Sequence, residues 1–236
     1  MPRYKYDILE CGYCQDKEEV SVMKQEGNRP YHHGDLRRAL LDAAFQLVAE
    51  RGVSDFTLRE VARQAGVSHN APYHHFADKA ELVVALTIEG FQMLEQALRS
   101  AYEQTPGTPL ERTLAISGAY LRFAIEHPAA FRLMFRPELR QSSHDAKECD
   151  AAVKNAADAA FQILRDGISA SQRAGLLRTE QSVEMLALAL GSTMHGLTVL
   201  FLDSILIKEK PSFSIEEKEQ TATQIMHMVA QGLVAR

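Results

Sequence analysis

Apolar side chains recur at helical spacing along most of the chain after residue 34. In several segments they follow the i, i+3, i+4, i+7 rule, which places them on one face of an α-helix. No stretch alternates apolar and polar positions for long enough to predict a β-strand, and no internal repeat is present. The pattern predicts an all-α protein. The expected helices cover residues 35–51, 58–65, 69–75, 78–98, 110–125, 128–135, 145–174, 181–206 and 215–234.

The clearest local signals lie in residues 57–82. Thr57 and Glu60 have the Thr-x-x-Glu spacing of a capping box. Gly66 can adopt the left-handed conformation that ends a helix, and Ser68 can cap the helix that follows. Two short capped helices around a glycine turn form a helix-turn-helix. In that motif the second helix enters the major groove of DNA, so the stretch predicts DNA binding.

The same stretch carries a longer set of residues at fixed spacing. The set comprises Thr57, Val61-Ala62, Ala65-Gly66-Val67-Ser68, Tyr73, Phe76, Lys79 and Leu82. It resembles the TetR family of bacterial transcriptional regulators over about residues 34–98. The resemblance implies a dimeric regulator with an N-terminal three-helix DNA-binding domain and a C-terminal helical domain for ligand binding and dimerisation. It also implies that the fourth helix connects the two domains as a pivot.

This organisation predicts three parts of the chain. Residues 1–33 are expected to be a flexible tail, residues 34–80 the DNA-binding domain, and residues 81–236 the ligand-binding and dimerisation domain. The Pro106-Gly-Thr-Pro109 sequence predicts a loop after the fourth helix. Helix one should begin at Asp35 and stop at Gly52, and Gly90 is expected to be a weak point in helix four.

The third helix supplies the candidate DNA-reading residues. An Asn can bond adenine through two hydrogen bonds, and an Ala can contact the thymine methyl group. The candidates for base contact are His69, Asn70, Ala71 and His74, with Ser68 at the start of the helix. The candidates for phosphate contact are Thr57, Arg59, Tyr73 and Lys79. The inward-facing residues are expected to be Val61, Ala62, Val67 and Phe76. For the polar candidates the alternative is an ordinary solvated surface.

Aromatic, soft and polar side chains on the C-terminal helices are candidates for a ligand pocket. They are Phe123, His127, Phe131, Met134, Phe135, Phe161, Met194 and His195. Such residues at helical spacing are also typical of a plain core. The Met194-His195-Gly196-Leu197 sequence resembles the end of the Trp-His-Gly signature of one TetR C-terminal subgroup, but this chain contains no Trp.

A single short reading helix covers few base pairs, so two copies are expected on a palindromic operator. The candidate dimer interface is formed by the apolar helices 181–206 and 215–234, the latter through Ile225, Met228, Val229 and Leu233. The segment from Met185 to Ile207 is long and apolar, but its Asp203 and His195 disfavour a membrane span. We therefore expect a cytoplasmic homodimer whose partners are double-stranded operator DNA and a small-molecule effector.

The net charge of −5 excludes a uniformly basic nucleic-acid coat. Residues 29–79 nevertheless carry seven Lys and Arg against six Asp and Glu, and five of the nine histidines. Within the tail, Arg29, His32 and His33 are candidates for minor-groove or phosphate contact. Met23 is an alternative start for the native protein.

Cys11 and Cys14 form a Cys-x-x-Cys pair, which is typical of a redox pair or of half a zinc site. Only Cys149 remains to complete a zinc site, so a disordered leader is the favoured interpretation. The chain lacks the His-Glu-x-x-His, Gly-x-Ser-x-Gly and glycine-rich phosphate motifs of common enzyme classes. No catalytic residue, metal or cofactor is expected. A helical adaptor that binds protein instead of DNA is the main alternative to a regulator.

Overall fold

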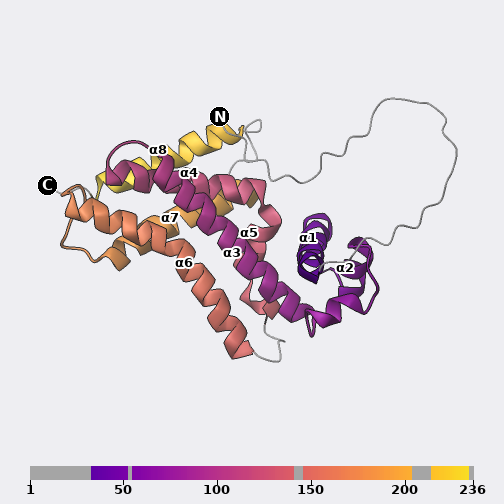
Figure 1. The fold of residues 1–236 in the computed structure, drawn as a ribbon. Coiled ribbons are helices and arrows are strands. Elements are labelled where there is room, and N and C mark those ends of the chain that lie inside the picture. The colour runs from indigo at the N-terminus through magenta and orange to yellow at the C-terminus, as the bar shows by residue number, and fades with distance from the viewer. Residues whose placement is uncertain (1–32, 53–54, 141–145, 204–213, 234–236) are drawn as a thin grey trace. The chain divides into compact units, whose positions relative to one another are not determined.

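The computed structural model describes residues 33–52, 55–140, 146–203 and 214–233, and every regular element in these ranges is a helix (Figure 1). This confirms the all-α prediction. The elements are α1 (His33–Arg51), α2 (Leu58–Gln64), η1 (Ala71–His74), α3 (Lys79–Gln104), α4 (Pro109–Glu126), α5 (Pro128–Met134), η2 (Pro137–Arg140), α6 (Ala146–Arg173), α7 (Val183–Asp203) and α8 (Ile215–Gln231).

A first apolar core joins α1, α2, η1 and the beginning of α3. Leu40 and Leu47 of α1, Val61 of α2 and Phe76 after η1 are all buried in it. Each fully buried side chain of this size contributes about 1.5–3 kcal/mol to folding. The segment between α2 and α3 is short, so this core is what holds it in place.

A second core is built from α3, α4, α6, α7 and α8. The amino-terminal part of α3 places Leu82 and Leu86 in the first core, and its later turns place Leu94 and Leu98 in the second. Along its length α3 packs against α4, α5 and α6. Figure 1 shows α3 running from the small helices into the C-terminal bundle. The two cores are therefore joined by one continuous helix.

The short helix α5 is a second connection between the cores. Leu133 is fully buried in the first core, whereas its neighbours Phe131 and Met134 are buried in the second. The helix packs against α1, α3 and α4. Pro128 begins it, as the sequence predicts, because a proline at the first turn removes no intrahelical hydrogen bond.

Two sequence expectations about the helices were wrong in detail. Helix α1 begins at His33, two residues before the predicted Asp35 start, and Gly52 follows it with a φ of 87°, as expected. Gly90 is not a weak point of α3. It is buried against α5, where a methyl group on its Cα would lie 3.0 Å from Cγ and Sδ of Met134. The glycine lets α3 and α5 approach closely.

Helix α7 is apolar on more than one face. Leu186, Leu190 and Met194 are buried, whereas Met185 and Leu188 are 56% and 67% exposed. By length and composition alone this helix is suited to crossing a membrane, yet it packs against α4, α6 and α8. The expectations for Cys11, Cys14, Met23, Arg29 and His32 lie outside the described residues.

Candidate functional site

Both ends of α2 carry the local signals that the sequence predicts. Thr57 Oγ1 accepts from the Glu60 backbone N–H at 3.3 Å, and the Glu60 carboxylate accepts from the Thr57 backbone N–H at 2.9 Å. This confirms the predicted capping box. Gly66 has a φ of +69°, the left-handed conformation expected at the end of α2. The chain then reverses toward η1.

A second contact ties the beginning of α2 to the end of α1. Arg51 Nη1 lies 2.8 Å from Oε1 of Glu60. The Thr57 hydroxyl and the Arg51 guanidinium together hold the pKa of the Glu60 carboxyl below its usual value. The sequence pattern does not predict this pair, because nine residues and a turn separate its members.

The predicted third helix is not an α-helix. Residues 69–75 contain only the four-residue 3₁₀ helix η1, and the cap is Asn70, not Ser68; the Asn70 side chain makes no capping hydrogen bond. Pro72 is the second residue of η1, in the first turn, where its missing N–H removes no intrahelical hydrogen bond. The N–H groups of Ala71 and Tyr73 donate to the carbonyls three residues earlier, at 2.9 and 3.2 Å, which is the 3₁₀ pattern.

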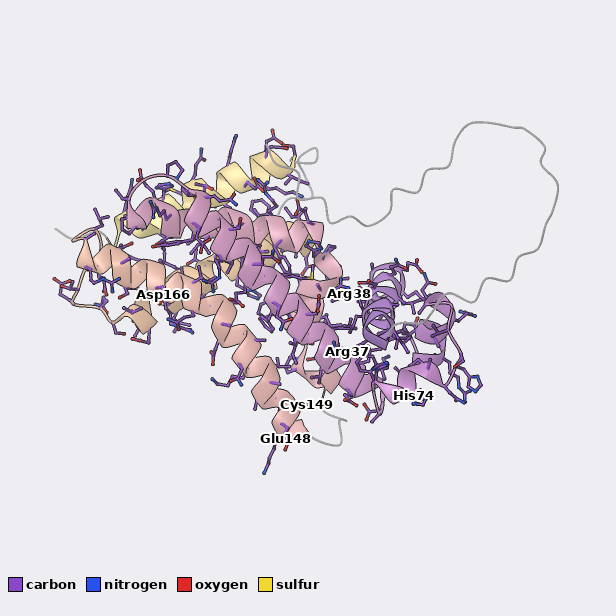
Figure 2. All side chains as sticks on the ribbon, in the orientation of Figure 1. Arg37, Arg38, His74, Glu148, Cys149 and Asp166 are labelled. Atoms are coloured by element: carbon purple, nitrogen blue, oxygen red, sulfur yellow. The ribbon has the colours of Figure 1, made fainter. Side chains whose placement is uncertain are left out.

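The candidate base-contacting residues lie on the outer side of this segment. Ser68, His69, Asn70 and His74 are exposed, and Ala71 is half-buried. Figure 2 labels His74 at the outer edge of the N-terminal helices. On the opposite side Pro72 and Phe76 are buried, at 2% exposure for Phe76, which places Phe76 in the core as predicted. The segment therefore presents polar side chains from an anchored backbone.

The candidate phosphate contacts surround the same surface. Arg59 is exposed and Tyr73 is 50% exposed. Lys79 is half-buried, with its Nζ 4.4 Å from the centre of the Phe56 ring. Burial lowers the pKa of the Lys79 ammonium, and the carboxylates of Asp55 and Glu60 oppose that change. The Lys79 charge is thus held at the start of α3 by an aromatic face.

The C-terminal bundle contains a cavity of about 430 Å³ between α6 and α7, open toward solvent. Its lining residues are Phe135, Phe161, Leu164, Arg165, Glu184, Ala187, Leu188, Gly191, Ser192 and His195. Three of them, Phe135, Phe161 and His195, were named from the sequence. The others were missed because small, aliphatic and charged residues at helical spacing carry no signal that separates a cavity wall from a core or an ordinary surface.

The other candidate ligand residues lie away from the cavity wall. Phe123 and His127 pack against each other with ring centres 5.2 Å apart. Met194 is buried in the second core, and Met134 lies against Gly90. Phe131 does not line the cavity but stacks on the His195 ring, with centres 5.7 Å apart.

Tyr120 is a functional candidate that the sequence analysis missed. Its side chain is fully buried in α4, and its hydroxyl lies 2.8 Å from Nδ1 of His195. Burial raises the pKa of the Tyr120 phenol and lowers the pKa of the His195 imidazole, so both groups are neutral near pH 7. A signal was present, since a tyrosine inside an apolar helix needs a hydrogen-bond partner.

Comparisons with known proteins agree with this arrangement. Residues 40–86 match the family model of bacterial regulatory proteins of the tetR family, and residues 113–216 match that of the tetracyclin repressor-like C-terminal domain. A protein of unknown function from Rhodococcus sp. RHA1 is 32% identical, with a TM-score of 0.73 over 87% of this chain and 99% of the other.

Two other solved structures share the fold. The TetR family transcriptional regulator PfmR from Thermus thermophilus is 20% identical, with a TM-score of 0.62 over 81% of this chain and 97% of its own. The ketosteroid transcriptional regulator KstR2 of Mycobacterium tuberculosis is 24% identical, with a TM-score of 0.56 over 85% and 95%. Together with the anchored helix-turn-helix, these matches establish that the chain belongs to the TetR family of DNA-binding transcriptional regulators.

Proposed function

We propose that this regulator is a dimeric repressor that binds a palindromic operator and is released from it by a small-molecule effector. In this proposal residues 34–80 form the DNA-binding domain and residues 81–236 the ligand-binding and dimerisation domain. The observation that carries it is the exposed polar surface of Asn70, Tyr73 and His74 on a backbone anchored by buried Pro72 and Phe76. A reading surface must be rigid and accessible at the same time.

The roles within that surface divide by chemistry. Asn70, His69 and His74 contact base edges, because amide and imidazole groups match the hydrogen-bonding pattern of the major groove. Lys79, Tyr73 and Arg59 contact phosphate, because they surround the reading segment with donors. The Thr57 hydroxyl already bonds Glu60, so it is not a free donor for phosphate. Thr57 contributes to phosphate contact only through its position at the start of α2.

The proposed dimer interface is the outer face of α7 and α8. Met185 and Leu188 of α7 and Met228 of α8 are 56%, 67% and 63% exposed. Large apolar side chains gathered on neighbouring helices mark an interaction surface. A twofold arrangement of this surface would present two reading segments to the two half-sites of a palindrome.

The proposed effector site is the cavity between α6 and α7. Phe135 follows α5 directly and forms part of the cavity wall, while Leu133 of α5 is buried in the first core, which is the core of the proposed DNA-binding domain, here called the reading head. A ligand that favours one position of α5 therefore also favours one arrangement of the head. Release follows when that arrangement no longer matches the spacing of the half-sites.

Binding selection from a randomised DNA library, followed by titration of the selected site, tests the DNA-reading part. Asn70→Ala should change which base pairs are selected. Lys79→Ala should weaken every site alike and reduce the slope of log affinity against log salt by about one. The control is Lys154→Ala on α6. The Lys154 ammonium pairs with Asp158, outside the proposed DNA-binding domain, so this substitution should leave both readouts unchanged.

An unchanged salt slope in Lys79→Ala would exclude the phosphate contact, and an unchanged base preference in Asn70→Ala would exclude base reading by Asn70. Absence of any sequence-selective binding by the wild-type chain would instead favour a protein-binding adaptor.

A further inference from the structure

The Tyr120–His195 hydrogen bond determines what the proposed effector cavity offers to a ligand. The two side chains come from α4 and α7, and the His195 ring lies against Phe131 and Phe135 with centres 5.7 and 4.4 Å away. These contacts hold the imidazole in one orientation. His195 also lines the cavity. The position of the imidazole proton therefore decides whether a molecule that enters the cavity meets a hydrogen-bond donor or an acceptor on His195.

Only one of the two tautomers of the neutral His195 ring gives the buried Tyr120 O–H an acceptor. If Nδ1 carried the proton and donated to Tyr120, the buried phenolic O–H would have no acceptor among the described residues. A buried hydroxyl without an acceptor is strongly disfavoured. The Tyr120 O–H therefore donates to Nδ1, and the proton of the neutral imidazole resides on Nε2. Burial keeps the ring neutral by lowering its pKa.

The Nε2–H group is then a donor without an acceptor in the described part of the chain. The two nitrogens lie on different edges of the ring, so Nε2 points away from Tyr120. No described residue accepts from Nε2. Two other polar residues of the lining have partners of their own: Ser192 donates to the Ala189 carbonyl, and Arg165 donates to Gln162 and to the Asp158 carbonyl. The third, Glu184, is exposed, and its carboxylate is an acceptor rather than a donor.

The remaining surface of the cavity is apolar and carries no excess charge. Phe135, Phe161 and Leu164 supply aromatic and aliphatic walls. Arg165 and Glu184 bring one charge of each sign. A ligand with a net charge gains little in such a site, whereas an apolar body with one oriented acceptor fits it.

We propose that the effector is an uncharged, apolar carbonyl compound whose oxygen accepts a hydrogen bond from Nε2 of His195, and that Tyr120 is the positioning residue that fixes the donating tautomer. This inference rests on the proposed effector role of the cavity. It adds the chemical class of the ligand and the residue that selects it.

Matched probes test the acceptor requirement. Benzophenone and diphenylmethane have nearly the same shape and differ only in the carbonyl group. By calorimetric titration the full chain should bind benzophenone about three- to tenfold more tightly, the range of one neutral hydrogen bond. His195→Phe should bind both probes equally, because it keeps an aromatic ring and removes the donor. Tyr102→Phe on α3 is the control and should keep the preference.

The tautomer is tested separately by long-range ¹⁵N–¹H correlation spectra of the imidazole. Wild-type His195 should show its proton on Nε2, and Tyr120→Phe should lose that single state together with most of the probe preference. A merely structural role of Tyr120 would leave the tautomer unchanged. If His195→Phe fails to fold, the wild-type tautomer and Tyr120→Phe still decide the question.

Equal binding of the two probes by the wild-type chain, binding of neither, or a proton on Nδ1 would overturn the inference. A DNA titration without probe separates this failure from failure of the proposed function. If the chain binds its operator but shows no preference for the carbonyl probe, only the proposed ligand class is excluded. If the chain does not bind an operator, the repressor proposal is excluded.

Discussion

At Gly167, α6 lies close to side chains of α3 and α4. A methyl group on its Cα would lie 2.5 Å from Oγ1 of Thr113 and 3.0 Å from Cε2 of Tyr102. The Thr113 hydroxyl cannot move away freely, because it donates to the Pro109 carbonyl at 2.7 Å and is buried. We expect Gly167→Ala to destabilise the protein by about 1–3 kcal/mol through overpacking, measured by urea denaturation.

The matched control is Gly118→Ala on α4, where the added methyl would meet only Thr223 Oγ1 at an ordinary 3.9 Å. There the better helix propensity of Ala should leave stability unchanged or raise it by up to about 1 kcal/mol. Equal effects of the two substitutions would show that the close approach at Gly167 is not what selects glycine.

At the scale of one element, α2 depends on its cap. Its seven residues are too few for a stable isolated helix. Thr57→Ala removes the hydroxyl that accepts from the Glu60 N–H and should cost about 0.5–2 kcal/mol of unfolding free energy, measured by urea denaturation. Thr221→Ala on α8 is the control, since its hydroxyl donates only to a carbonyl of its own helix. A similar loss in both variants would contradict the capping role.

The same cap predicts a pH dependence. Hydrogen bonds from Thr57 and the ion pair with Arg51 lower the pKa of Glu60 below its ordinary value near 4.5. A lowered carboxyl pKa adds stability above the unfolded value, and this contribution is lost as the pH falls through the folded value. The stability difference between wild type and Glu60→Gln should thus be largest at neutral pH and shrink below about pH 4.5. A pH-independent difference would contradict this interpretation.

The helices that the sequence predicted well are those with complete local signals. The Thr57 cap and the Gly66 turn follow from residues within ten positions of each other, and both appear in the structure. The η1 segment was overestimated because residues 69–75 are too few for capping and spacing signals to separate a 3₁₀ turn from an α-helix. The Tyr120–His195 bond joins residues 75 positions apart, and no local pattern reports such a pairing.

At the scale of the whole molecule, the exposed methionine and leucine side chains of α7 and α8 test the proposed dimer. Met185→Asp and Met228→Asp place a charge on the proposed interface and leave the cavity wall intact; an unpaired buried carboxylate is strongly disfavoured there. Each should raise the dimer dissociation constant at least tenfold in sedimentation velocity experiments. Tyr73→Asp changes a similarly exposed aromatic site on the reading head and should leave assembly unaffected. A wild-type monomer at micromolar concentration would exclude the dimer.

The placement of α5 has a consequence for how the molecule melts. Leu133 belongs to the core of the reading head, and Phe131 and Met134 belong to the core of the C-terminal bundle. Because a single helical turn serves both cores, neither can lose its packing without exposing apolar surface of the other. Differential scanning calorimetry should therefore show a single heat-absorption peak for the two cores together. The calorimetric and van't Hoff enthalpies of that transition should be equal.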